Sequence, residues 1–555
     1  MAAGGLEAEL IDVIGVFIVA GAVGAFVAKF VRLPYTIALL VAGFVASLAG
    51  VEIGIELTHD VILLVLLPPL LFEGAATTDM EAFRADLPVI LPIAVVGLLI
   101  STVLVGFAVH AALGFPLLLA LLFAAMVLPT DPVSVLALFE EIGAPERLAV
   151  LVEGESLLND GVGVVVFTTL LALVESGATP DALTDPVRLA GVGADIAIAS
   201  LGGAVVGLTA GYAVYRVMVS LDEHMTEIVL TIVLAYGSFL LAEHYLHVSG
   251  VIATVVAGLF MGHRGRQYAM SPETKVSVFS AWETGAFIVN TFIFLVIGVQ
   301  TPLGQIIEVG HLLAPAIVIV LLGRAAAIYP LVTLSNRFRP ERIPLSTQHV
   351  LVWSGLHASI PIALALGLPP GFPLRTELRT MTFGIAAFSL VVQGLTIRRL
   401  TDALGIATIS DEERLYQLLI ARARAVDEVI EAAEDLRERN RISESVYERF
   451  SAEYTAERDD LNEAIARLLA EYPQLRDQER LVGERRLLQR ERAAIRDAEY
   501  DGLVTTDVAE DLLGEVNLKL DRVRRGETTV TTDVETEGYE ESWRQRAREH
   551  GLLEE

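Results

Sequence analysis

The chain has 555 residues, of which 54% are hydrophobic, and its mean hydropathy is +0.58. Soluble domains hold roughly 45 to 50% apolar residues, so this composition excludes an ordinary soluble domain and indicates a polytopic membrane protein. The formal net charge is −29, and the absence of cysteine excludes disulfide and thiolate chemistry. Lysine occurs only at Lys29, Lys275 and Lys519, against 37 arginines. Few lysines and many acids favour a high-salt environment, so we expect a halophilic source such as a haloarchaeon.

Apolar and charged residues are divided unevenly along the chain. Apolar runs fill residues 10–400, whereas residues 401–555 hold 39 acidic and 23 basic side chains, a net charge of −16. We therefore expect a transmembrane domain over residues 1–400 and a charged, water-soluble part after it. The first residues lack the basic segment and cleavage site of a signal peptide, so we expect the first apolar run to be a mature span.

The apolar runs have the length needed to cross a bilayer, roughly 20 residues. The sequence therefore predicts an all-α polytopic membrane protein with about thirteen transmembrane helices. The expected spans are 9–29, 35–50, 59–76, 87–114, 116–139, 147–175, 188–218, 225–246, 249–262, 278–300, 308–336, 348–369 and 377–398.

Basic residues in the loops predict the orientation of the spans. With the N-terminus outside, thirteen arginines and lysines fall on the cytoplasmic side, and only Arg188, Arg375 and Arg379 fall on the other. The cytoplasmic set is Lys29, Arg32, Arg84, Arg147, Arg216, Arg264, Arg266, Lys275, Arg337, Arg339, Arg342, Arg398 and Arg399. The positive-inside rule then places the acidic C-terminal part in the cytoplasm and the protein in the cell membrane.

The third predicted span carries an isolated acid, Glu73, after an apolar run that contains Pro68 and Pro69. An intramembrane carboxylate is expensive to bury and usually faces a cavity or a partner. Glu73 is therefore a candidate ion ligand or cavity-lining residue, with a snorkelling side chain as the alternative.

The fifth predicted span is interrupted by LPTDPV, residues 128–133. Pro129 and Pro132 lack a backbone N–H and disfavour helical geometry in the residues before them, so we expect the helix to break here. A break at bilayer depth is tolerated where it lines a cavity, and transporters bind ions at such breaks. Asp131 and Thr130 are therefore candidate cation ligands. The alternative is that Asp131 only caps the next half-helix.

The sixth predicted span contains GESLLNDG, residues 154–161. Glu155 and Asn159 lie at i and i+4 on one helix face, and Ser156 and Asp160 lie one position round from them. These oxygen ligands suit a hard cation rather than a transition metal. A carboxylate in a low-dielectric cavity can hold either a proton or a metal ion, so Asp160 is a candidate site for both. A purely structural polar network is the alternative.

The later spans contribute an unpaired cation and a second break. Arg324 cannot lose its proton and needs an acidic partner inside the membrane. The available acids are Glu73, Asp131, Glu155, Asp160, Asp195 and Glu283. The twelfth predicted span contains Gly355, Ser359 and Pro361, which indicate another broken helix, and two breaks in corresponding positions point to a site between inverted repeats. Asp195, His244 and His247 have no motif around them and receive no function.

Residues 401–525 are predicted to form a cytoplasmic helical regulatory domain. Their apolar spacing is helical, and Ser443 and Thr505 are candidate N-caps of two similar turn-and-helix units. We expect helical hairpins that serve regulation or dimer contact. Residues 526–555 are polar and expected to be disordered.

Several motifs together resemble the NhaP-type sodium/proton antiporters, the electroneutral branch of the monovalent cation:proton antiporters. The resemblance covers roughly residues 10–400 and is carried by LPTDPV, GESLLNDG, LPPLLFEGA, Arg324 and the pattern Trp282, Glu283, Asn290 and Gly298. It implies two inverted six-helix repeats with crossed discontinuous helices, spans 1–6 and 8–13, and a core domain that moves against a dimerisation domain in a homodimer.

The resemblance also implies roles for individual residues. Asp160 would be the principal carrier, with Asp131, Ser156, Thr130 and possibly Glu73 around a sodium ion held at Asp131 and Asp160. Asn159 stands where electrogenic relatives have a second aspartate, which implies one sodium exchanged for one proton. Glu155 and Arg324 would form a structural ion pair. The resemblance implies the transported ions and the lipid bilayer as partners. It implies no cofactor, no catalytic activity and no nucleic-acid partner.

His357 departs from the family pattern, because many relatives have an arginine at this place. A histidine can titrate near neutral pH, so pH sensing is one interpretation of His357, and a neutral packing residue is the other. Among whole-protein functions, a potassium/proton antiporter of the same fold is the nearest rival. A channel, an intramembrane hydrolase and a membrane sensor signalling through the tail are further alternatives, and the hydrolase lacks a motif such as HExxH.

Overall fold

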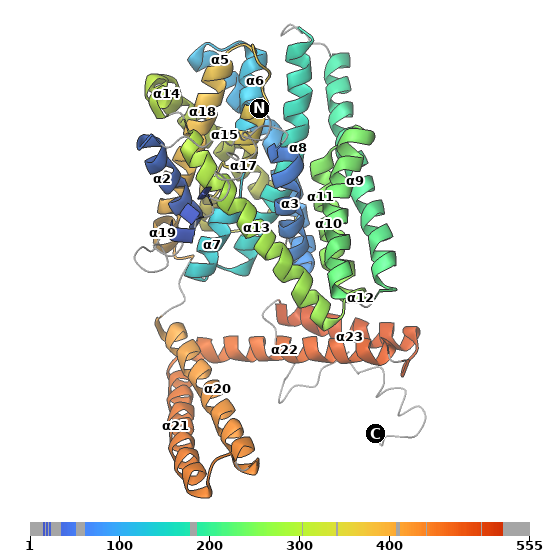
Figure 1. Cartoon of the computed structure of the whole chain (residues 1–555), viewed down its shortest axis with the longest axis vertical. Helices are drawn as coiled ribbons and strands as arrows, with labels where there is room; N and C mark the ends of the chain where they lie inside the picture. Colours follow the sequence, from blue (N-terminus) through green and yellow to red (C-terminus); the bar gives the residue numbers. More distant parts are fainter. Residues whose placement is uncertain are drawn as a thin grey trace. The chain divides into compact units, whose positions relative to one another are not determined.

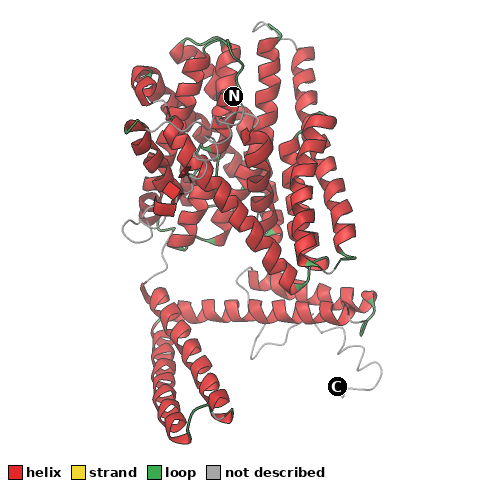
Figure 2. Ribbon diagram, viewed as in Figure 1, coloured by secondary structure: helices red, strands yellow, loops and turns green. Residues whose placement is uncertain are grey.

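A computed structural model describes residues 15–16, 18–19, 21–23, 35–50, 61–177, 186–221, 223–301, 303–339, 342–406, 411–439, 441–500 and 502–524. The chain divides into two compact units, Met1–Thr408 and Ile409–Glu555. In all these ranges the regular secondary structure is helical (Figure 2). The predicted first span falls largely outside the described residues, and the segment 526–555 lies wholly outside them.

The first unit consists of apolar helices joined by short loops (Figure 1). Labels with η mark π-helical turns. In chain order the helices are α2 (Tyr35–Leu48), η1 (Val61–Leu66), α3 (Leu67–Thr77), α4 (Met80–Leu91), η2 (Pro92–Gly97), α5 (Leu98–Leu113), α6 (Leu117–Val127), α7 (Val133–Ile142), α8 (Glu146–Glu175), α9 (Pro186–Met218), α10 (His224–Leu240), η4 (Leu241–Tyr245), α11 (Gly250–Phe260), η5 (Met261–Gly265), α12 (Arg266–Tyr268), α13 (Pro272–Gln300), α14 (Leu303–Glu308), α15 (Gly310–Ser335), α16 (Leu345–Trp353), α17 (Ser359–Leu366), α18 (Arg375–Phe388), η6 (Ser389–Gln393) and α19 (Gly394–Ala403).

Seven of the described helical segments are long and apolar enough to cross a membrane. They are Met80–Leu113, Glu146–Glu175, Ala190–Met218, Met225–Tyr245, Thr274–Gln300, Gly310–Ser335 and Arg375–Ala403. Shorter apolar helices lie between them. The predicted all-α, multi-pass membrane class is therefore confirmed. The number of thirteen spans and the inverted repeats stay predictions.

Two of the apolar helices are broken where the prolines and small residues predict it. The helix begun by α6 stops at Val127 and resumes as α7 at Val133, which leaves residues 128–132 non-helical. The helix begun by α16 stops at Trp353 and resumes as α17 at Ser359, which leaves residues 354–358 non-helical. Because such backbone exposes polar groups, each break has to find hydrogen-bond partners inside the protein.

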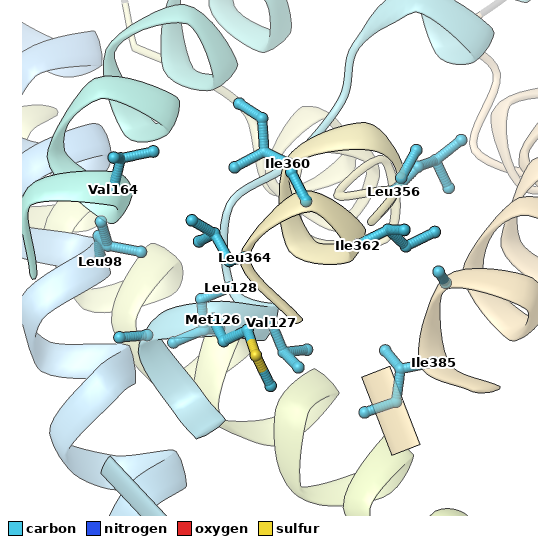
Figure 3. Packing of buried hydrophobic residues seen from close by; sticks show 14 of the residues in the cluster. Leu98, Met126, Val127, Leu128, Val164, Leu356, Ile360, Ile362, Leu364 and Ile385 are labelled. Carbon is cyan, nitrogen blue, oxygen red and sulfur yellow. The ribbon is translucent and has the colours of Figure 1, made fainter. Parts of the chain in front are cut away.

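The two broken helices are enclosed by tightly packed apolar side chains (Figure 3). Met126 and Val127 at the end of α6, and Leu128 of the first break, lie near Leu364 of α17 in this view. All four side chains are at most 2% exposed. The apolar shell keeps water away from the breaks except where a cavity admits it, and this strengthens electrostatic interactions inside.

Helices α2 and α13 cross at two glycines. A Cβ atom added to Gly43 would meet the carbonyl oxygen of Leu295 and lie 2.8 Å from the Cα atom of Gly298. The two backbones can approach this closely only because both positions lack a side chain, as in other small-residue contacts between membrane helices.

In its described residues, 411–439, 441–500 and 502–524, the second unit holds four long helices in two adjacent pairs. They are α20 (Asp411–Glu438), α21 (Glu444–Glu471), α22 (Pro473–Tyr500) and α23 (Thr506–Arg524). Helix α20 packs against α21, and α22 packs against α23. Ser443 occupies the N-cap position of α21, but its hydroxyl contacts Ser445 instead of capping the helix.

We predict that Gly43→Ala destabilises the membrane unit by about 1–3 kcal/mol, because the added methyl group overpacks the contact with α13. Gly285→Ala is the matched control, since a Cβ atom there meets nothing within 4 Å. Thermal melting of the two purified variants in detergent measures the difference. Equal melting temperatures would show that the α2–α13 crossing is looser than described.

Candidate functional site

The two helix breaks satisfy each other's backbone groups. The backbone N–H of Asp131 donates to the carbonyl oxygen of Leu356 at 2.7 Å, and Nδ1 of His357 lies 3.2 Å from the carbonyl oxygen of Pro129. The breaks therefore cross and hold each other in place. This arrangement matches the crossed discontinuous helices predicted from the sequence.

The side chain of Asp131 uses both of its oxygens at this crossing. Oδ1 accepts a hydrogen bond from the backbone N–H of Val133 at 3.0 Å, in the first turn of α7. Oδ2 accepts from the hydroxyl of Ser359 at 3.2 Å, in the first turn of α17. Asp131 thus binds the backbone at the start of α7, although the N-cap position itself is Pro132. The same side chain also lines a cavity.

The polar stripe of α8 is buried along its whole length. Glu155, Ser156, Asn159 and Asp160 are between 2% and 8% exposed. Oδ1 of Asp160 has no hydrogen-bond partner although it is buried. A buried, unpaired carboxylate oxygen is costly unless it holds a proton or a cation.

Thr130 links the first break to the α8 stripe. Its hydroxyl lies 3.0 Å from the hydroxyl of Ser156 and accepts from Nδ2 of Asn159 at 3.4 Å. Gly163 lets the break approach α8, because a Cβ atom there would lie 2.5 Å from Cγ of Pro129. Thr130 and Ser156 are not among the residues that line the cavity.

Arg324 of α15 pairs with Glu155. A guanidinium nitrogen lies 2.8 Å from Oε2 of Glu155, and both side chains are at most 6% exposed. The same guanidinium donates to the carbonyl oxygens of Leu351 at 3.0 Å and Val352 at 3.2 Å, at the end of α16. The pair therefore joins three helices. Gly355 leaves room for it, because a Cβ atom there would lie 2.6 Å from Cζ of Arg324.

A cavity of about 770 Å³ reaches Asp131 and Asp160. Its walls come from α3, α7, α8, α13 and α17, and Gly143 and Ala144 of the loop before α8 belong to it. The acids that line it are Glu73, Asp131, Glu140, Glu146, Glu153, Asp160 and Glu283. An apolar cavity wall that carries only negative charge attracts cations and raises their local concentration.

Glu73 lies in this cavity but not in a tight cluster with the two aspartates. Among the described residues, no three His, Asp or Glu side chains are close enough together to hold one metal ion.

Glu153 lines the cavity but was not predicted from the sequence. Its position seven residues before Asp160 on α8 was the available signal, since that spacing returns to the same helix face.

His357 is 1% exposed and its Nε2 has no hydrogen-bond partner. Nδ1 carries the proton that the carbonyl oxygen of Pro129 accepts, so a neutral ring meets the geometry. A charged ring would leave an N–H donor buried without an acceptor. A buried neutral ring is what the packing interpretation of His357 expects, and both interpretations stay predictions. Asp195, His244 and His247 are exposed side chains outside the cavity lining.

Crossed broken helices with buried carboxylates, reached by an acidic cavity, define a multi-pass membrane transporter rather than an enzyme. Comparison with known proteins agrees. The family described as "Sodium/hydrogen exchanger, transmembrane" matches residues 15–403.

Two curated relatives and one solved structure illustrate the similarity. The Na⁺/H⁺ antiporter NhaG of Bacillus atrophaeus is 33% identical over 522 residues, which are 91% of this chain and 96% of the relative. The Na⁺/H⁺ antiporter ApNhaP of Aphanothece halophytica is 37% identical over 404 residues, 72% of this chain and 75% of the relative. The sodium proton antiporter MjNhaP1 of Methanocaldococcus jannaschii, at 19% identity, shares the fold with a TM-score of 0.56 over 72% of this chain and 98% of that chain.

The chain belongs to the sodium/hydrogen exchanger family, as a protein of the NhaP type.

We predict that the Glu155–Arg324 pair stabilises the fold only as a pair. Glu155→Leu or Arg324→Leu alone should cost about 3–5 kcal/mol, because each leaves an uncompensated buried charge. The double variant should recover much of that loss. Melting temperatures of the four proteins in detergent measure the effect, and losses that simply add in the double variant would contradict a direct coupling.

Proposed function

We propose that the protein exchanges sodium for protons across the cell membrane by alternating access. The observation that carries the proposal is the buried, unpaired oxygen of Asp160, beside Asp131 in an acidic cavity. The names of the curated relatives support the same exchange. No cofactor takes part, and the ions themselves are the substrates.

Competition at Asp160 accounts for the exchange. A sodium ion and a proton cannot occupy the same carboxylate oxygens, and each of them neutralises the charge. An empty, charged site is expensive to move through the low-dielectric interior, so only a loaded site changes sides. Obligatory exchange follows from this penalty without any further gate.

Asp160 and Asp131 provide the charged ligands of the cation. Ser156 and Thr130 provide the neutral ligands. Their hydroxyl oxygens lie 3.0 Å apart, and each would interact more strongly with a cation at the crossing than with the other hydroxyl. Glu73, on the cavity wall, contacts the cation before it reaches Asp131 and Asp160. All these groups are hard oxygen ligands, as an alkali cation requires.

The exchange is electroneutral, with one sodium for one proton. Asn159 offers an amide in place of a second titratable carboxylate, and it is held by Thr130. Glu155 is paired with the permanent positive charge of Arg324. Both oxygens of Asp131 accept hydrogen bonds, whereas one oxygen of Asp160 has no partner, so Asp160 is the carboxylate that exchanges a proton for sodium.

The cavity faces the cytoplasm in this arrangement. The positive-inside assignment places Arg147, at the start of α8, on the cytoplasmic side, and the neighbouring residues Gly143, Ala144 and Glu146 line the cavity. An inward proton gradient then drives sodium outward. Residues 401–525 would be the cytoplasmic regulatory domain of a homodimer.

A potassium/proton antiporter of the same fold is the nearest alternative. Carboxylate and hydroxyl oxygens bind either alkali cation, so cation preference has to be measured. A sensor that signals through the tail would move no ions, and a channel would not need a protonatable site between two breaks.

We predict that Asp160→Asn abolishes sodium-dependent dequenching of a pH dye in everted vesicles, because the amide neither binds a proton nor neutralises a cation. Asp195→Asn is the control, since Asp195 lies in a membrane helix but is exposed and outside the cavity. It should transport like the unaltered protein. Undiminished dequenching in Asp160→Asn would refute the proposed mechanism.

We predict that the transport rate does not depend on membrane potential, because one charge moves in each direction. Proteoliposomes clamped at different potentials with potassium and valinomycin measure this. A sodium-driven proton flux that accelerates with potential would show an unequal stoichiometry.

A further inference from the structure

Asn290 of α13 has a buried amide that the proposed mechanism does not use. Its side chain is 9% exposed, and its Oδ1 has no hydrogen-bond partner. An unpaired acceptor inside a membrane helix costs free energy, so such a group in a native protein calls for an explanation.

Asn290 lines the same cavity as Asp131 and Asp160. It shares a face of α13 with Glu283 and Ala286, which also line the cavity and lie seven and four residues before it. Helix α13 therefore contributes the polar residue Asn290 to the cavity that Asp160 of α8 also lines.

The neighbouring buried residue Thr291 lies outside the cavity lining and differs from Asn290 in its hydrogen bonding. Thr291 is 4% exposed, does not line the cavity, and its hydroxyl donates to the hydroxyl of Tyr35 at 3.4 Å. The polar atom that packs between helices has a protein partner. Asn290 lines the cavity, and its buried amide oxygen has no partner.

We propose that Asn290 is a ligand of the transported cation, whose amide oxygen replaces a water molecule as the cation approaches Asp131 and Asp160. This inference rests on the proposed cation transport. An amide oxygen binds an alkali cation but does not take up a proton, whereas a carboxylate can bind either one. Asn290 therefore favours the metal ion in its competition with the proton at Asp160.

The test compares sodium binding and sodium transport in Asn290→Leu, Asn290→Asp and Thr291→Val. Leucine fills a similar volume without the oxygen, so the half-saturating sodium concentration should rise about fivefold, as expected for one lost ligand contact. The maximal rate should be retained. Asn290→Asp keeps an oxygen and should bind sodium at least as tightly as the unaltered protein, and Thr291→Val should leave sodium affinity unchanged.

Sodium affinity is measured by titration calorimetry of the purified protein as well as by vesicle transport. An unchanged affinity in Asn290→Leu would overturn the assignment, and so would equal losses in Asn290→Leu and Asn290→Asp, because equal losses indicate a packing role. If Asn290→Leu does not fold, Asn290→Ala carries the same expectation. Weakened sodium binding in a protein without antiport would refute the proposed function and leave the ligand assignment standing.

Discussion

Two stretches of non-helical backbone cross inside an apolar unit, and their polar groups have to be satisfied by the protein itself. The hydrogen bonds from Asp131 to Leu356 and between His357 and Pro129 meet this need. Once the crossing is fixed, its position determines where Asp131 lies, which face of α8 meets it, and where a cation can be received. The carboxylate of Asp160 and the cavity that leads to it both depend on this crossing.

The α8 stripe divides two tasks between neighbouring helix faces. Glu155 is tied to Arg324, which also binds the end of α16 through two carbonyl oxygens. Asp160 is left with an unpaired oxygen at the cavity. A charge that has a permanent partner stabilises the scaffold, and a charge that lacks one is available for exchange. In the account proposed above, this difference separates the structural acid from the transporting acid.

Much of this arrangement is predictable from the sequence, because its causes are local. The prolines of LPTDPV predict the first break, the four-residue spacing in GESLLNDG predicts the polar stripe, and an unpaired Arg324 requires an acid. What the residues alone left open was decided by packing between distant segments. The residues by themselves offered six acids as partners of Arg324. They also left open whether Asp131 binds the start of the next half-helix or lines a cavity, and its side chain does both. The spacing of Glu153 before Asp160 is a local signal for a shared helix face, but the unpaired amide of Asn290 depends on which helices enclose the cavity, and no local pattern shows that.

The central claim is that one proton and one sodium ion compete for Asp160. Titration calorimetry of the purified protein with sodium at several pH values tests it most directly. The account predicts that the apparent dissociation constant rises about tenfold for each unit by which the pH falls below the range where the site is deprotonated, with about one proton released per sodium bound. In that acidic range, a dissociation constant that does not change with pH, or sodium binding without proton release, would contradict it.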